Sequence, residues 1–219
     1  MKFLPAALLP PVIKAAVIET ADLLFEWMIS RLGGIHETRD ALEGSWFNDA
    51  MIVMMAGLPG TGKTTLAREV AAPTGGRVLS KDDVRHALFP AEEIEYSSRQ
   101  DDFCLQVMLE TASFLLRQNR ERLIFLDGRP FSRRYQIDNV VNVAKSLHQE
   151  WRILECVCAE EVVKQRLEDK GREHPAANRN FQLYLEVRSR FEAITLRKTV
   201  IDTGRPIAAC VRQAREALR

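Results

Sequence analysis

The chain of 219 residues carries almost no net charge, few aromatic side chains and no cysteine spacing typical of a metal site. Its 31 basic and 30 acidic residues are interspersed, which argues against a broadly basic nucleic-acid-binding protein. Its four cysteines, Cys104, Cys156, Cys158 and Cys210, form neither a zinc nor a C-x-x-C pattern. We therefore expect reduced core thiols in a cytoplasmic protein.

The sequence also lacks an apolar run that could cross a membrane. Residues 1–11 begin like a signal peptide, but three prolines interrupt them and no small-x-small cleavage site follows. Residues 12–32 place apolar side chains on one broad helical face, and the charged residues among them argue against a spanning helix. We predict a helical extension over residues 1–50, which covers the core or instead forms a homodimer contact or a wall of the substrate site, and no membrane partner.

The stretch GLPGTGKT, residues 57–64, matches the pattern G-x-x-x-x-G-K-[ST] at every fixed position. It follows the apolar run 51–56, which predicts a buried strand, and precedes apolar residues at helical spacing. Glycines let backbone N–H groups surround a phosphate, Lys63 reaches the β- and γ-phosphates, and the Thr64 hydroxyl can hold Mg²⁺. The predicted nucleotide-binding residues are Gly57, Leu58, Pro59, Gly60, Thr61, Gly62, Lys63, Thr64 and Thr65.

Strand-like and helix-like runs alternate after this motif. This order predicts an α/β fold with a parallel sheet covered on both faces and ligands at the carboxyl ends of its strands. The predicted strands are 51–56, 77–80, 122–127, 151–158 and 199–203.

Asp82 follows the second predicted strand and begins a helix that Ser80 can cap. Asp82 and Arg85 are three residues apart and share a helical face, whereas Asp83 points elsewhere. A carboxylate beside a phosphate loop can accept the proton of an attacking hydroxyl, and a neighbouring arginine can neutralise charge on the acceptor. The alternative is a solvated helix start.

Asp127 ends the third predicted strand, where a carboxylate can reach Mg²⁺ or the acceptor. Arg129 and Arg133 follow it, and guanidinium groups suit phosphate or carboxylate, so an anionic acceptor is one interpretation. An exposed helix start is the other interpretation for Arg133.

A second group of cations flanks a polar loop rich in turn-forming residues, and we predict a lid over about residues 166–180. Arg166 and Lys170 are four residues apart on one helical face, and Arg172 follows them. Cations in a lid can close over a triphosphate and stabilise the transition state.

The stretches GLPGTGKTTLA, LSKDDVRHALF, LDGRPFSRR and VVKQRLEDKGRE occur in this order, and residues 51–217 resemble P-loop kinases related to polynucleotide kinase, zeta toxin and gluconate kinase. The resemblance implies a P-loop three-layer fold with a five-stranded parallel sheet, similar to adenylate kinase with its lid. It also implies a general base at Asp82, an acceptor-binding Arg85, an acceptor or metal contact at Asp127 and a lid arginine at Arg166. The polynucleotide kinases of this group have a second lid arginine where this sequence has Lys170.

These observations predict a kinase domain over residues 51–219 that uses ATP and Mg²⁺ to phosphorylate a hydroxyl of a small polar or anionic metabolite. A kinase of polynucleotide 5′-hydroxyl ends is one alternative, although no basic stripe rich in aromatic residues is visible. A nucleotide-binding ATPase switch without an acceptor is another, and the pair Asp82 and Arg85 favours transfer over it.

Overall fold

The computed structural model describes residues 50–118, 122–169 and 178–219. The chain divides into two units, Met1–Gly44 and Ser45–Arg219, and every described residue belongs to the second. The predicted helical extension lies outside the described residues apart from Ala50, and so do Lys170 and Arg172. No helix in the described part of the chain is both long and apolar enough to cross a membrane.

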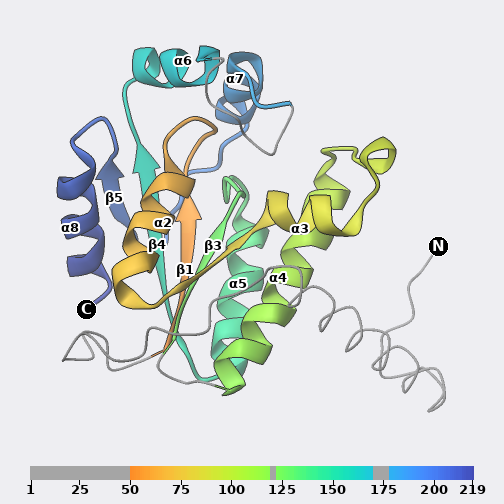
Figure 1. Cartoon of the computed structure of the whole chain (residues 1–219), viewed down its shortest axis with the longest axis vertical. Helices are drawn as coiled ribbons and strands as arrows, with labels where there is room; N and C mark the ends of the chain where they lie inside the picture. Colours follow the sequence, from red (N-terminus) through yellow and green to blue (C-terminus); the bar gives the residue numbers. More distant parts are fainter. Residues whose placement is uncertain (1–49, 119–121, 170–177) are drawn as a thin grey trace. The chain divides into compact units, whose positions relative to one another are not determined.

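The core of the second unit is a five-stranded parallel sheet with strand order β2-β3-β1-β4-β5 (Figure 1). All five strands were predicted from the sequence, and their ends differ from the prediction by one residue at most. The strands are β1 (Met51–Ala56), β2 (Arg77–Ser80), β3 (Leu123–Asp127), β4 (Glu150–Val157) and β5 (Thr199–Asp202).

Helices cover both faces of the sheet, as the continuous apolar sequence of β1 requires. Ile52, Met54 and Ala56 face a core formed with α4 and α5, and the intervening residues of β1 face a core formed with α2 and α8. The helices are α2 (Lys63–Thr74), α3 (Lys81–Leu88), the short η2 (Ala91–Glu93), α4 (Ser98–Gln118), α5 (Arg134–Ser146), α6 (Glu160–Glu168), α7 (Phe181–Ser189) and α8 (Ile207–Ala217).

The strand order places three functional segments at one edge of the sheet. β3 lies between β1 and β2, so the phosphate loop after β1, Asp127 at the end of β3 and the start of α3 after β2 are neighbours. In register, Ser80 pairs with Asp127. α6 and α7 lie beyond the carboxyl ends of the strands, above the phosphate loop in Figure 1.

Candidate active site

The phosphate loop is shaped by a glycine that no other residue can replace without strain. Gly57 has a φ of 125°, and a Cβ atom there would lie 2.3 Å from the carbonyl oxygen of Cys156. Gly62, which precedes α2, is also left-handed with a φ of 83°. The loop therefore turns its backbone toward the start of α2, where N–H groups and the helix dipole favour an anion.

Lys63 is buried in this loop. Its Nζ donates hydrogen bonds to the carbonyl oxygens of Gly57 at 2.9 Å and Leu58 at 2.8 Å. Burial lowers the pKa of Lys63, and the negative charge of Asp127 opposes that shift. An anion bound in the loop would stabilise the charged ammonium, because an unmatched buried charge is costly.

Asp127 is buried at the end of β3, and its Oδ1 has no hydrogen-bond partner among the described residues. Burial raises the pKa of Asp127, while a hydrogen bond from the Thr64 side chain and the charge of Lys63 oppose the shift. A buried carboxylate oxygen without a partner, beside the hydroxyl of a residue that lines the cavity, fits the oxygen ligands that Mg²⁺ prefers. Thr64 and Asp127 are therefore the residues that would hold this ion.

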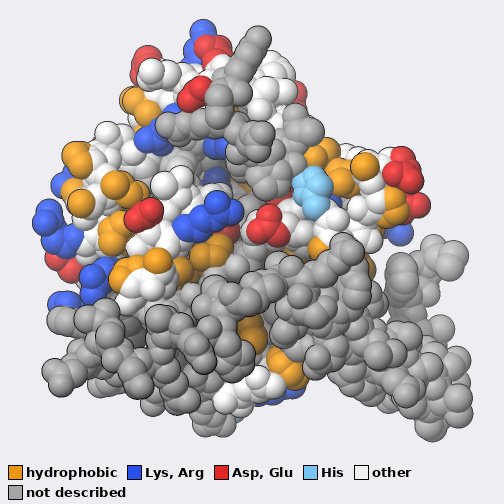
Figure 2. Space-filling view, viewed as in Figure 1, with side chains coloured by type: hydrophobic (Ala, Val, Ile, Leu, Met, Phe, Trp, Pro, Cys, Tyr) orange, Lys and Arg blue, Asp and Glu red, His pale blue; other side chains and the backbone are white. Residues whose placement is uncertain are grey.

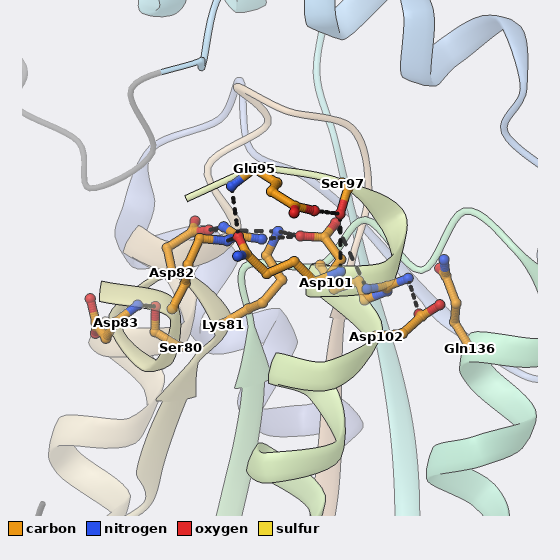
Figure 3. A network of polar contacts seen from close by, with 12 residues as sticks. Ser80, Lys81, Asp82, Asp83, Glu95, Ser97, Asp101, Asp102 and Gln136 are labelled. Atoms are coloured by element: carbon orange, nitrogen blue, oxygen red, sulfur yellow. Dashed lines mark hydrogen bonds and ion pairs between the residues drawn. The ribbon is translucent and has the colours of Figure 1, made fainter. Parts of the chain in front are cut away.

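Asp82 and Arg85 form the second part of the site. Ser80 caps α3 by accepting a hydrogen bond from the N–H of Asp83, as predicted. Arg85 Nη1 donates to Asp82 Oδ1 at 2.7 Å, and the Arg85 side chain is fully buried. Figure 3 shows Asp82 within a polar network, while Asp83 lies apart beside Ser80.

The same network contains Asp101, which α4 contributes. Asp101 Oδ1 accepts hydrogen bonds from Lys81 Nζ at 2.6 Å and from Arg85 Nη2. Gln100 completes the environment of Arg85 by accepting a hydrogen bond from its Nε at 3.1 Å. Asp101 thus fixes Lys81 and Arg85 around the Asp82 carboxylate.

Arg129 lies beside this network and is also buried. Its Nη2 donates to Asp102 Oδ1 at 2.5 Å, and its Nη1 is 3.8 Å from Asp101 Oδ2. Nε and Nη1 are buried and have no hydrogen-bond partner among the described residues. The Tyr135 hydroxyl donates to Asp102 Oδ2 at 3.1 Å, so α5 also holds the Asp102 carboxylate in place.

Arg166 lies on α6 and contacts Thr203, the residue that follows β5. Its Nη2 donates to the carbonyl oxygen of Thr203 at 2.7 Å, and the Thr203 hydroxyl donates to the carbonyl oxygen of Thr61 at 2.6 Å. Thr203 follows β5 directly, so it links Arg166, the end of the sheet and the phosphate loop. The predicted lid arginine is therefore connected to the nucleotide-binding motif through Thr203.

A cavity of about 640 Å³ joins these parts. Lys63, Thr64, Asp82, Asp101 and Arg166 all line it. Figure 2 shows basic side chains gathered around the hollow below α6 and α7. The cavity thus has a phosphate-binding end at the loop and a carboxylate-containing end at α3 and α4.

Residues 52–194 match the family model described as an AAA domain, AAA_33. That match spans well over half of the chain. The chain belongs to this AAA domain family, whose members are P-loop kinase-like domains. A search of curated proteins found no match.

Solved kinase structures share the fold of this AAA domain. A gluconokinase from Sinorhizobium meliloti is 18% identical, with 78% of this chain and 92% of the other covered at a TM-score of 0.57. A sugar kinase from Janibacter is 20% identical, covering 78% and 94% at 0.57. The APS kinase of Mycobacterium tuberculosis, solved with AMPPNP and APS, is 15% identical, covering 78% and 98% at 0.60. These likenesses establish the P-loop kinase fold.

Not every predicted acceptor-binding residue of the AAA domain lines the cavity: Arg85, Asp127 and Arg129 are buried and are not among the lining residues, and Arg133 makes its contact elsewhere. Arg133 Nη1 donates to Glu192 Oε1 at 2.9 Å, and both side chains are exposed. Arg133 is not among the residues that line the cavity. Its observed contact joins the start of α5 to the segment after α7.

Sequence reasoning missed Lys81, Gln100 and Asp101. Ser97 and Gln100 have the S-x-x-Q spacing of a helix start, and the Ser97 hydroxyl does accept a hydrogen bond from the Gln100 N–H at the beginning of α4. That pattern could have located the helix, but not the cations that the Asp101 carboxylate binds.

Proposed function

We propose that this protein is an ATP- and Mg²⁺-dependent phosphotransferase that acts on a hydroxyl group of a small molecule. The observation that carries the proposal is the position of Asp82, a mostly buried carboxylate that lines the same cavity as the phosphate loop. A hydroxyl acceptor needs space beside the phosphate loop as well as a base for its proton. The end of the cavity built by α3 and α4 offers both, whereas hydrolysis of ATP alone needs no space for an acceptor.

The phosphate loop, together with Asp127 beside it, would bind the nucleotide and its metal ion. Backbone N–H groups at the start of α2 and the Lys63 ammonium suit the β- and γ-phosphates. Thr64 and Asp127 would hold Mg²⁺, which when bound neutralises negative charge on the triphosphate. These groups position the γ-phosphoryl at the boundary between the two ends of the cavity.

Asp82 would act as the general base. The acceptor oxygen forms a bond to the γ-phosphorus, the bond from that phosphorus to the β–γ bridging oxygen breaks, and ADP leaves. The acceptor proton passes to the Asp82 carboxylate, which Arg85 orients through its 2.7 Å hydrogen bond. Arg166 supports the phosphate side of the reaction from α6.

The test is a screen of the purified full-length protein for ADP release across sugars, nucleosides, antibiotics and 5′-hydroxyl oligonucleotides. Once an acceptor is found, Asp82→Asn should lower the transfer rate by a factor of roughly 10² to 10⁴ while ATP still binds. Asp83→Asn is the matched control, because Asp83 is exposed on the same helix, and it should retain most activity.

Two results would contradict the proposal. Transfer only to oligonucleotide 5′ ends would make the protein a polynucleotide kinase. Slow ATP hydrolysis, unaffected by every acceptor and by Asp82→Asn, would indicate a nucleotide switch.

A further inference from the structure

We infer that the phosphoryl acceptor is an uncharged polyhydroxylated compound, and this inference rests on the kinase function proposed above. The sequence left the acceptor open between a polar and an anionic metabolite, because arginines follow both Asp82 and Asp127. The structure shows which partners those arginines have. The acceptor end of the cavity, where α3 meets the start of α4, has its charges already matched.

Three cations and three carboxylates form the polar network at this end (Figure 3). Lys81 pairs with Asp101, Arg85 with Asp82 and Asp101, and Arg129 with Asp102. The formal charges of the six groups sum to zero. An anionic acceptor would therefore meet no excess positive charge here, and it would lie next to the Asp82 carboxylate.

Arg85 in particular is not available to an acceptor. Its side chain has no exposed surface, and each of its three nitrogens donates to a protein group: Gln100, Asp82 or Asp101. The Tyr96 ring packs against it, with 4.9 Å between the ring centroid and Arg85 Cζ. A bound anion would have to displace one of the carboxylates, which would leave that carboxylate buried without its partner.

Arg129 Nε and Nη1 have no hydrogen-bond partner among the described residues, but both atoms are buried and Nη1 lies 3.8 Å from Asp101 Oδ2. Arg129 is not among the residues that line the cavity. Its charge is instead matched by Asp102, whose second oxygen is held by Tyr135. This arginine therefore supports the wall of the site and does not offer a contact to an anion in it.

The groups that line the acceptor end suit hydroxyls. Asp82 and Asp101 present carboxylates to it: Asp82 Oδ2 has no hydrogen-bond partner among the described residues, and Asp101 Oδ2 has only the longer ion-pair contact of 3.8 Å with Arg129 Nη1. Carboxylate oxygens accept hydrogen bonds from hydroxyl groups, and Ser98 can both donate and accept. Tyr96 adds an aromatic surface, and its φ of 50° is unusual for a bulky residue, a form of strain that gathers at binding sites.

Unmatched cations line other parts of the cavity. Arg68 on α2 and Arg205 after β5 have no ion pair with described residues, and both are exposed. Arg68 lies on α2, which begins at the phosphate loop, and Arg205 lies two residues after Thr203, whose hydroxyl contacts that loop. The phosphate loop is where a triphosphate would bind. The cavity is thus polarised, with positive charge at the nucleotide end and balanced charge at the acceptor end.

The experiment compares pairs of similar acceptors, in each of which the anion carries a carboxylate or phosphate group at one hydroxyl-bearing position of the neutral compound and keeps its other hydroxyls. The full-length protein with [γ-³²P]ATP and Mg²⁺ is offered glucose against glucuronate, ribose against ribose 5-phosphate, and adenosine against adenosine 3′-monophosphate. The neutral and anionic fractions of a metabolite extract, separated on an anion-exchange column, are tested in the same way to include further neutral and anionic acceptors. We expect label in the neutral arm, with kcat/KM at least about tenfold higher than for the matched anion.

The acceptor preference of an Asp101→Asn variant tests the same charge balance. Asp101→Asn removes one of the three carboxylates, so kcat/KM for the anion divided by that for its neutral partner should rise about tenfold, whatever happens to overall activity. Asp102→Asn, whose side chain is 42% exposed and less critical to folding, should shift the ratio in the same direction. Asp138→Asn removes an exposed carboxylate on α5 and should leave the ratio unchanged.

The outcomes separate this inference from the proposed function. Preferred transfer to anions would overturn the inference while supporting the kinase, and Arg190, an exposed arginine that also lines the cavity, would then be the cation to replace. An unchanged ratio in both Asp101→Asn and Asp102→Asn would also overturn it. Transfer to neither arm, with ATP hydrolysis insensitive to every addition, would overturn the proposed function and this inference together.

Discussion

Replacing Arg85 with methionine tests whether this arginine is the structural centre of the site. The side chain is fully buried and forms ion pairs with Asp82 and Asp101. Its third nitrogen, Nε, donates a hydrogen bond to Gln100. Removing one partner of a buried ion pair costs about 3–5 kcal/mol, because the remaining charge is left unmatched. Lys81 remains 2.6 Å from Asp101 and 3.6 Å from Asp82. We therefore expect the loss at the low end, about 3 kcal/mol in the free energy of unfolding.

The assay is urea denaturation, supported by the thermal midpoint, which should fall by roughly 6–12 °C for a domain of this size. Arg134→Met is the matched control, because Arg134 forms an exposed ion pair with Asp138 on one helix. That variant should change stability by less than about 0.5 kcal/mol. A loss below about 1 kcal/mol for Arg85→Met, close to the control, would refute the buried network and restore Arg85 as a residue available to substrate.

Three further predictions follow from the phosphate side of the site. Burial raises the pKa of Asp127 in the ligand-free protein, so affinity for Mg²⁺ and ATP should fall as the pH drops through that raised pKa, and Asp127→Asn should bind Mg²⁺ and ATP weakly at every pH in calorimetric titrations. Arg166→Ala should lower turnover and ATP affinity together in steady-state kinetics, because the guanidinium joins α6 to Thr203 beside the loop, and unchanged kinetics would remove it from the lid. Burial raises the pKa of Cys156 to about 12, so iodoacetamide at pH 8 should modify the half-buried Cys158 first by peptide mass mapping, and early labelling of Cys156 would contradict its placement in the core.

The local features of this protein are determined by its sequence. Continuous apolar residues over β1 require a strand covered on both faces, and the glycines after it allow only a turn that opens a helix. The spacing of Asp82, Asp83 and Arg85 fixes which side chains share a face of α3, and the structure shows Asp83 exposed while the other two are buried. Each of these results depends on residues within about one or two helical turns, so propensity and periodicity are sufficient.

The contacts that give the site its charge balance were decided by tertiary structure. Lys81 and Asp101 are 20 residues apart, and Thr61 and Thr203 are 142 apart, so no local period relates them. Lys81 and Asp101 meet because α4 packs against α3, and Thr61 and Thr203 meet because the strand order β1-β4-β5 brings the ends of β1 and β5 to the same edge of the sheet. Arg129 and Arg133, four residues apart, show the same limit: the fold buries Arg129 beside Asp102 and directs Arg133 to Glu192. Sequence identifies a charged side chain, but its partner depends on which distant carboxylate the strand order and helix packing bring within hydrogen-bonding distance.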